Sequence, residues 1–401
     1  MDPTTARREP ASYAVPATPG QLAWLRDQVD DWRAEGLIDP ATAEAVLARY
    51  LESRRFSLGR LLLAVGTGFL GIGLIWLVAA NLDELSPLTR FLAVVVLWLT
   101  CLVGAEVLDS RRTSAVVVGA VRTLAAFGVG AVIFQAAQSL QVPAYEPGLV
   151  GLWGLGALVQ AYVTAARGPL LVAIAGFIGW VLWEAVEQNP TLTGTVLALT
   201  ASAVAALGMA GLHERWLPAF SGPWRHVGAG LALGGLFVAG LPVGVDGGLP
   251  SFGWTLALVT AAGVLAAATC LVGPVAARWE VLGGSLALTV GVVLAAWPAG
   301  ADSRSVGLDD LAHALVAVTA YVALSVGVAA VGTLRDAPLL SVTATLGLVL
   351  FTVVQSFAVF APIVQGAWLF LLLGAILLAA GVGFDRARRH LAATLEQESD
   401  R

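Results

Sequence analysis

The stretch "VVVGAVRTLAAFGVGAVIF", residues 116–134, indicates the environment in which this chain folds. As a helix it would be apolar on almost every side, and a helix of that kind must be surrounded by other apolar material. Its length is close to the roughly 20 residues that cross the hydrocarbon core of a bilayer. The stretch therefore predicts a transmembrane helix. Its one charged residue, Arg122, is the feature that this interpretation has to explain.

Similar apolar runs recur along the chain, and each has the length needed to span a membrane. They predict an all-α fold, a polytopic transmembrane helical bundle of about twelve spans. Only the short turn "FAPIVQ" separates the last two runs, so a count of eleven or thirteen stays open. The runs are 61–80, 91–108, 116–136, 148–166, 169–187, 194–212, 227–243, 252–272, 281–298, 311–332, 339–359 and 363–383.

Composition agrees with a membrane protein and excludes several kinds of chemistry. Hydrophobic residues make up 58% of the chain and charged residues 12%, whereas soluble domains are about a quarter charged. All 22 basic residues are arginine, so the chain has no lysine for a phosphate-binding loop or a Schiff base. The arginines are dispersed and the net charge is -5, which argues against nucleic-acid binding. Heavy use of alanine, glycine and valine points to a GC-rich bacterial genome.

The sequence contains no recognisable catalytic, cofactor or metal motif. The four histidines fall in different segments or at uninformative spacing, so no metal site is expected. Cys101 and Cys270 each lie inside an apolar run and are interpreted as small core residues. We therefore expect no catalytic residue, no cofactor and, on balance, no enzyme.

Four segments are expected along the chain: a disordered tail at 1–20, an amphipathic helical hairpin at 21–58, the membrane domain at 59–384 and a tail at 385–401. In the hairpin, Gly36 is placed to end the first helix, and Asp39 is placed to cap the second. The first 20 residues lack the apolar core of a cleavable signal peptide.

Arginine placement predicts the orientation. Cytoplasmic loops of membrane proteins carry an excess of basic residues. If residues 1–60 are cytoplasmic, the alternate loops fall into an arginine-rich set and an arginine-poor set, the latter with only Arg90 and Arg304. We therefore expect a multi-pass protein of the bacterial plasma membrane with both termini in the cytoplasm. The arginine-rich loops would contain Arg111, Arg112, Arg167, Arg215, Arg225, Arg278 and Arg335.

Two interpretations of Arg122 follow from this orientation. The residue would lie within about two turns of the cytoplasmic interface, where a long side chain can extend to the headgroups. That interpretation is favoured. In the alternative, the guanidinium faces the bundle and pairs with Glu106 on the preceding helix.

Other polar residues near the ends of the spans are candidate substrate contacts, together with Arg122. Gln135 and Gln138 lie at the outer end of one helix, although amides there more often hydrogen-bond to neighbouring helices. Glu184 is expected at headgroup level. Asp309 and His313 lie one turn apart, although acidic residues in a first turn also suit the helix dipole.

Two functions are weighed for this architecture. The first is a small-molecule or lipid-handling permease. The second is a non-transporting sensor or assembly component whose residues 21–55 bind a cytoplasmic protein through Trp24, Trp32 and Leu37. An intramembrane enzyme using Asp83 and Glu84 ranks last, because the outer loops are too short to build a substrate site. The lipid bilayer is the one partner that composition itself requires.

The chain also resembles a family of bacterial polytopic membrane proteins, the domain of unknown function 2157. The resemblance rests on "WRAEGLID" at 32–39, "LVAANLDELSPLTR" at 77–90, "FGVGAVIFQAAQSLQ" at 127–141 and "GLWGLGALVQAY" at 151–162. It covers roughly residues 21–187. Leu82 stands where the family is expected to have an aromatic residue beside Asn81, and an aromatic residue is also missing after Gln138. The resemblance implies a membrane topology and no particular activity.

Overall fold

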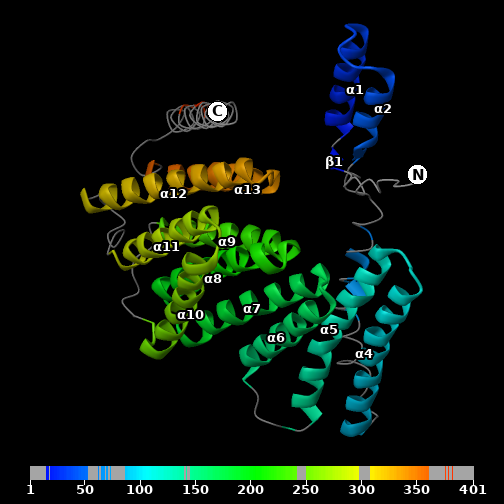
Figure 1. Ribbon diagram of the computed structural model, residues 1–401. Coiled ribbons are helices and arrows are strands. Elements are labelled where there is room, and N and C mark those ends of the chain that lie inside the picture. The colour runs from blue at the N-terminus through cyan, green and yellow to red at the C-terminus, as the bar shows by residue number, and fades with distance from the viewer. Residues whose placement is uncertain are drawn as a thin grey trace.

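The fold is almost entirely helical (Figure 1). The computed structural model describes residues 15–17, 19–52, 62, 65–67, 69, 70, 73, 86–139, 141, 145–241, 250–297, 308–360, 375, 378 and 382. Over this part of the chain, nine helices are long and apolar enough to cross a membrane. The protein is therefore a multi-pass membrane protein.

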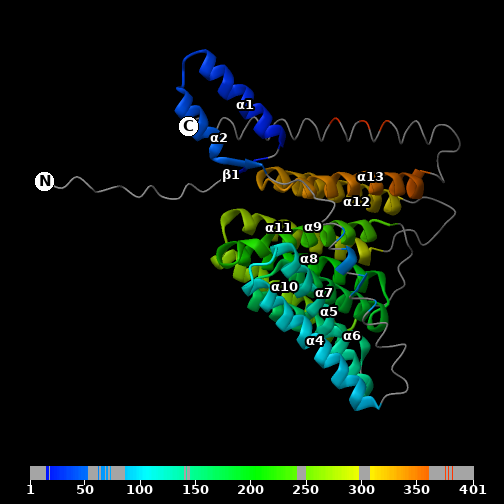
Figure 2. The same cartoon turned by 90° about the vertical axis from the view of Figure 1, so that its right-hand side faces the viewer.

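A small helical hairpin precedes the bundle and lies outside it in both views (Figures 1 and 2). Helix α1 (Pro19–Ala34) ends before Gly36, whose φ of +72° favours glycine, and α2 (Pro40–Ala48) follows. Strands β1 (Val15–Ala17) and β2 (Tyr50–Glu52) pair in parallel beside it. β1 and the start of α1 fall inside the stretch expected to be a disordered tail. Backbone pairing with β2, which has no local sequence signal, orders residues 15–17.

In the part of the chain that the structure describes, ten long helices follow, and short turns join them in the pairs α4–α5, α6–α7, α8–α9, α10–α11 and α12–α13. Nine meet the criteria for a membrane span, while α9 has Trp224, Arg225 and His226 close to its start. The expected runs at 61–80 and 363–383 lie mostly outside the described residues. The helices are α4 (Pro87–Ser110), α5 (Ala115–Ser139), α6 (Glu146–Thr164), α7 (Arg167–Gln188), α8 (Leu192–Trp216), α9 (Pro218–Ala239), α10 (Phe252–Val272), α11 (Val275–Ala296), α12 (Leu308–Leu334) and α13 (Pro338–Phe360).

Helix α8 is the centre of the bundle. In its most apolar 18-residue window, 67% of the residues are buried, more than in any other of the nine candidate spans. It packs against α7, α9, α10 and α11 (Figure 1). Small residues bring helices together elsewhere: a Cβ built at Gly176 of α7 would lie 2.9 Å from the Cα of Gly154 in α6. Small residues of this kind let helix backbones approach closely. Close packing matters in a membrane, because no hydrophobic effect drives one helix onto another there.

Several helices extend beyond the apolar runs that predict them. Helix α9 begins at Pro218 rather than at residue 227, and α11 begins at Val275 rather than at 281. Arg225, expected in a loop, therefore lies inside a helix. The apolar pattern fails in these first turns because they contain charged residues, and Arg225 and Glu280 are buried there as a pair.

The cap of α2 gives a pH-dependent prediction. Asp39 accepts a hydrogen bond from the Thr42 amide at 2.6 Å, and this bonding with Thr42 lowers the pKa of its carboxyl. Because the folded pKa lies below the unfolded one, the cap stabilises α2 above the unfolded pKa of about 3.9 and is lost as pH falls through the folded value. We expect hydrogen exchange of the amides of residues 41–48, corrected for intrinsic rates, to speed up in acid. Asp39→Asn should keep the cap and remove this pH dependence; an unchanged acid response in the variant would contradict the assignment.

Candidate functional site

Four charged side chains from four parts of the chain meet at one end of the bundle. They are Glu214 near the end of α8, Arg225 near the start of α9, Glu280 near the start of α11 and Arg335 just after α12. Arg225 Nε donates to Glu280 Oε2 at 2.7 Å, and its Nη2 contacts Glu214. Arg335 Nη1 lies 2.8 Å from Glu214 Oε1, and its Nη2 donates to Glu280 Oε1 at 2.7 Å. We call these four residues the charge ring.

Burial makes the charge ring costly to break. The exposed fraction of the side chain is 4% for Glu280 and 8% for Arg225, against 15% for Glu214 and 23% for Arg335. Each carboxylate contacts both guanidinium groups, so the ring is neutral as a unit. Removing one member of a buried ion pair leaves an uncompensated charge, which typically costs about 3–5 kcal/mol.

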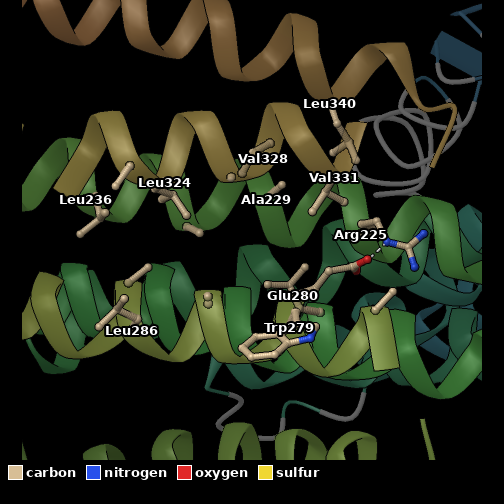
Figure 3. A pocket seen from close by; sticks show the side chains of 18 of the residues that line it. Arg225, Ala229, Leu236, Trp279, Glu280, Leu286, Leu324, Val328, Val331 and Leu340 are labelled. Atoms are coloured by element: carbon tan, nitrogen blue, oxygen red, sulfur yellow. Dashed lines mark hydrogen bonds and ion pairs between the residues drawn. The ribbon is translucent and has the colours of Figure 1, made fainter. Parts of the chain in front are cut away.

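The charge ring lies at one end of a cleft between α9, α11 and α12 (Figure 3). The cleft has a volume of about 600 Å³. Arg225, Glu280 and Arg335 line it, and its other lining residues are apolar or small. Figure 3 shows Leu236 and Leu286 at the end opposite Arg225, with aliphatic side chains between. We call this space the apolar cleft.

The apolar cleft is open on the side of the bundle. Trp279 and Leu286, which line it on α11, are 70% and 65% exposed. On a helix that crosses a membrane, exposed apolar side chains face lipid. Two residues that line the cleft thus face outward from the helices that the structure describes.

The sequence does not predict this site. Arg225 and Arg335 were expected in loops, and Glu214 and Glu280 were not among the candidate residues. One signal was present: both glutamates sit next to arginine-containing segments, in "HERW" at 213–216 and "ARWE" at 277–280, in the terminal turns of apolar helices. An isolated carboxylate near a membrane span needs a partner.

The favoured interpretation of Arg122 was wrong. Its side chain is only 14% exposed and is engaged by two carboxylates of the preceding helix. Its Nε and Nη2 each donate to Glu106 at 2.9 Å, and Nη2 also donates to Asp109 at 2.9 Å. A planar guanidinium pairs with a carboxylate through two parallel bonds, which fixes its direction. Arg122 and Asp109 also line a second cavity, of about 890 Å³, with residues of α5, α6 and α7.

The other candidate substrate residues are not brought together with the charge ring, and none lines the apolar cleft. Gln135 is buried and donates to Ser139 at 3.0 Å, while Gln138 is exposed. Glu184 is half-buried. Asp309 is exposed in the first turn of α12, and buried His313 has its Nε2 3.2 Å from the Leu294 carbonyl. Their substrate-binding role stays a prediction.

In the hairpin, Trp24 and Leu37 are 61% and 67% exposed, and Trp32 is half-buried. Asn81, Asp83 and Glu84 lie outside the described residues. Within the described ranges, no group of three or more histidine, cysteine or acidic side chains is placed to hold a metal ion.

Pairing of Arg122 predicts coupling with Glu106. Arg122→Gln should lower the free energy of unfolding in detergent by about 1.5–3 kcal/mol, the usual value of hydrogen bonds to charged groups. Glu106 is 51% exposed, so its carboxylate stays partly solvated and the loss should fall short of that for a fully buried pair. In a double-mutant cycle with Glu106→Gln, we expect the two losses to be less than additive. Strict additivity would show that the pair contributes nothing.

The charge ring predicts a larger effect. Glu280→Gln should destabilise the protein by about 3–5 kcal/mol, because it leaves buried Arg225 and half-buried Arg335 with one carboxylate. Exposed Glu146 in the first turn of α6 provides the control, and Glu146→Gln should change stability by less than about 1 kcal/mol. Both effects can be measured by heating the protein in detergent and recording the fraction that remains monodisperse. Equal effects of the two substitutions would contradict the burial of the ring.

Comparison with known families supports the membrane assignment. Residues 30–171, from within α1 to the first turns of α7, match the family described as "Predicted membrane protein (DUF2157)". The match includes Arg122 and Glu106 and ends before the charge ring. The chain matches no curated protein and no solved structure. The resemblance drawn from the sequence is thus confirmed: over residues 30–171 the chain is similar to the DUF2157 family of predicted membrane proteins.

Proposed function

We propose that this protein is a lipid-handling permease that binds an acyl chain in the apolar cleft. The observation that carries the proposal is the cleft itself, an aliphatic space with a lateral opening and charge at one end. Its volume of about 600 Å³ falls within the range of known ligand sites.

The lining of the cleft suits an acyl chain better than a polar solute. Over most of its length the cleft offers apolar side chains such as Leu236, Leu286 and Val331, with few hydrogen-bonding groups. A sugar or amino acid bound there would lose its hydrogen bonds to water without replacement. An acyl chain has no such bonds to lose, and it can enter sideways from the bilayer past Trp279.

The proposed orientation places the charge ring at the cytoplasmic end. The turns after α4, α6, α8, α10 and α12 are the arginine-rich ones, and they lie at one end of the bundle. The connections between them lie at the other end. By the positive-inside rule the arginine-rich end faces the cytoplasm. Twelve spans, two cytoplasmic termini and a bacterial plasma membrane complete this proposal.

A sensor or assembly component is the second candidate. The exposure of Trp24 and Leu37, on a hairpin outside the bundle, favours it. Large exposed apolar side chains of this kind often anchor protein interfaces. Residues 21–55 would then bind a cytoplasmic protein, and the cleft would bind lipid without moving it.

Two glycines allow the cleft to be filled without disturbing the backbone. Gly283 and Gly327 line it, and a Cβ built at either has no atom within 4 Å. Gly283→Leu or Gly327→Leu should displace about two CH₂ groups of a bound chain at roughly 0.8 kcal/mol each, which weakens binding about tenfold. Native mass spectrometry of the purified protein titrated with phosphatidylcholine measures the loss.

Gly263 of α10 provides the matched control. It also has no atom within 4 Å of its built Cβ, but it is exposed and lies outside the cleft lining. Gly263→Leu should leave lipid binding unchanged. If the cleft variants bind lipid as the control does, the acyl-chain proposal is wrong. Scrambling of a labelled lipid in proteoliposomes separates the two functions: binding without scrambling would favour the sensor.

A further inference from the structure

The apolar cleft has a polarity along its length that matches a whole lipid rather than an acyl chain alone. Its charged lining residues, Arg225, Glu280 and Arg335, gather at one end. In Figure 3 the Arg225–Glu280 pair lies beyond Val331, and the aliphatic side chains extend away from it toward Leu236. A molecule that fills the cleft would therefore place its polar part against the charge ring.

The polar end offers hydrogen-bond donors rather than acceptors. Both oxygens of Glu280 are already engaged, Oε2 by Arg225 at 2.7 Å and Oε1 by Arg335 at 2.7 and 2.9 Å. Each guanidinium has five N–H donors, more than its contacts with the two glutamates use. Glu214, the other carboxylate of the ring, does not line the cleft. A ligand therefore meets two cations and one carboxylate whose oxygens are occupied.

We propose that the polar end of the apolar cleft binds the phosphate of an anionic glycerophospholipid, with Arg335 as its main contact. The inference rests on the proposed acyl-chain site and adds the class of headgroup. Guanidinium groups bind phosphate oxygens through charge-assisted hydrogen bonds. A cationic or zwitterionic headgroup would place its cation beside the two guanidinium groups that line the cleft, where both oxygens of the one lining carboxylate, Glu280, are already engaged.

Arg335 is the member of the ring best placed to reach a ligand. It lies in the turn between α12 and α13 and has the most exposed side chain of the four, at 23%. Both arginines contact both glutamates, but the Arg225 side chain is only 8% exposed. Arg335 can therefore turn part of its donor set toward a headgroup, while Arg225 keeps the carboxylates neutralised.

Arg278 is a matched control for surface charge. It lies at the same end of the bundle, is exposed, and donates from Nε to the Gly273 carbonyl at 3.2 Å. It does not line the cleft. Loss of Arg278 changes the net charge of the protein as much as loss of Arg335 does. Any difference between the two variants therefore reports on the cleft and not on general attraction to anionic membranes.

The experiment compares binding of phosphatidylglycerol and phosphatidylcholine with equal acyl chains, by native mass spectrometry of the full-length protein. We expect about a tenfold preference of the wild-type protein for phosphatidylglycerol, because both lipids carry the phosphate but only phosphatidylcholine adds a cation beside the two guanidinium groups. Arg335→Gln should reduce the preference to less than about threefold, while Arg278→Gln keeps it. Arg335→Lys, which keeps the charge of the ring, should retain most of the preference and guards against loss of folding in Arg335→Gln.

Equal binding of the two lipids by the wild-type protein would overturn the headgroup assignment, even if Gly283→Leu weakens both and the acyl-chain site stands. Equal loss of preference in Arg278→Gln and Arg335→Gln would also overturn it, because surface charge would then account for the preference. Lipid binding that Gly283→Leu leaves intact would instead overturn the acyl-chain site, and the headgroup assignment with it.

Discussion

Four charges taken out of water constrain the arrangement of α8, α9, α11 and α12. Glu280 and Arg225 are almost fully buried, and neither could remain charged there without the other. Because Glu214 and Arg335 complete the set, the ends of four helices from three consecutive pairs must meet at one place. The geometry of the ring thus fixes how the α8–α9, α10–α11 and α12–α13 pairs sit relative to one another.

The apolar cleft is a consequence of this arrangement. Alanines and glycines on α9, α11 and α12, among them Ala232, Gly283 and Gly327, leave space along the helices beyond the ring. Where α8 packs on its neighbours, alanine and glycine bring the backbones together. Along the cleft, the charge ring holds the helices at one end, and the space between them stays open to the side. An apolar space that opens to the side and carries charge at one end matches a lipid, which has an apolar chain and a charged headgroup. The proposed function depends on that combination.

Arg122 and the charge ring follow the same physical rule, that a charge within or near a membrane helix is paired with an opposite charge. The two sites differ in how deeply the pairs are buried. Arg122 joins two carboxylates that are about half-exposed, at the ends of a single helix pair. The charge ring joins buried groups from several pairs. The sequence showed the first possibility, because Arg122 and Glu106 are close in the chain and at the same expected depth. It could not show the whole of the second, because Glu280 lies 55 residues from each of its arginine partners, although Glu214 and Arg225 are only 11 residues apart.

Apolar patterning and interactions between residues close in the sequence determined the helices, the membrane environment and the hairpin with Gly36 and Asp39 at its turn. Apolar runs of spanning length have few alternatives to a helix in a bilayer, because every backbone group must be bonded within its own segment. Tertiary structure alone decided which polar residues are buried together and where a cavity remains. The terminal turns that hold Arg225 and Glu280 are too polar to be recognised as parts of membrane helices. Their charged residues can be buried only because partners from other helices neutralise them, and those partners are known only from the tertiary structure.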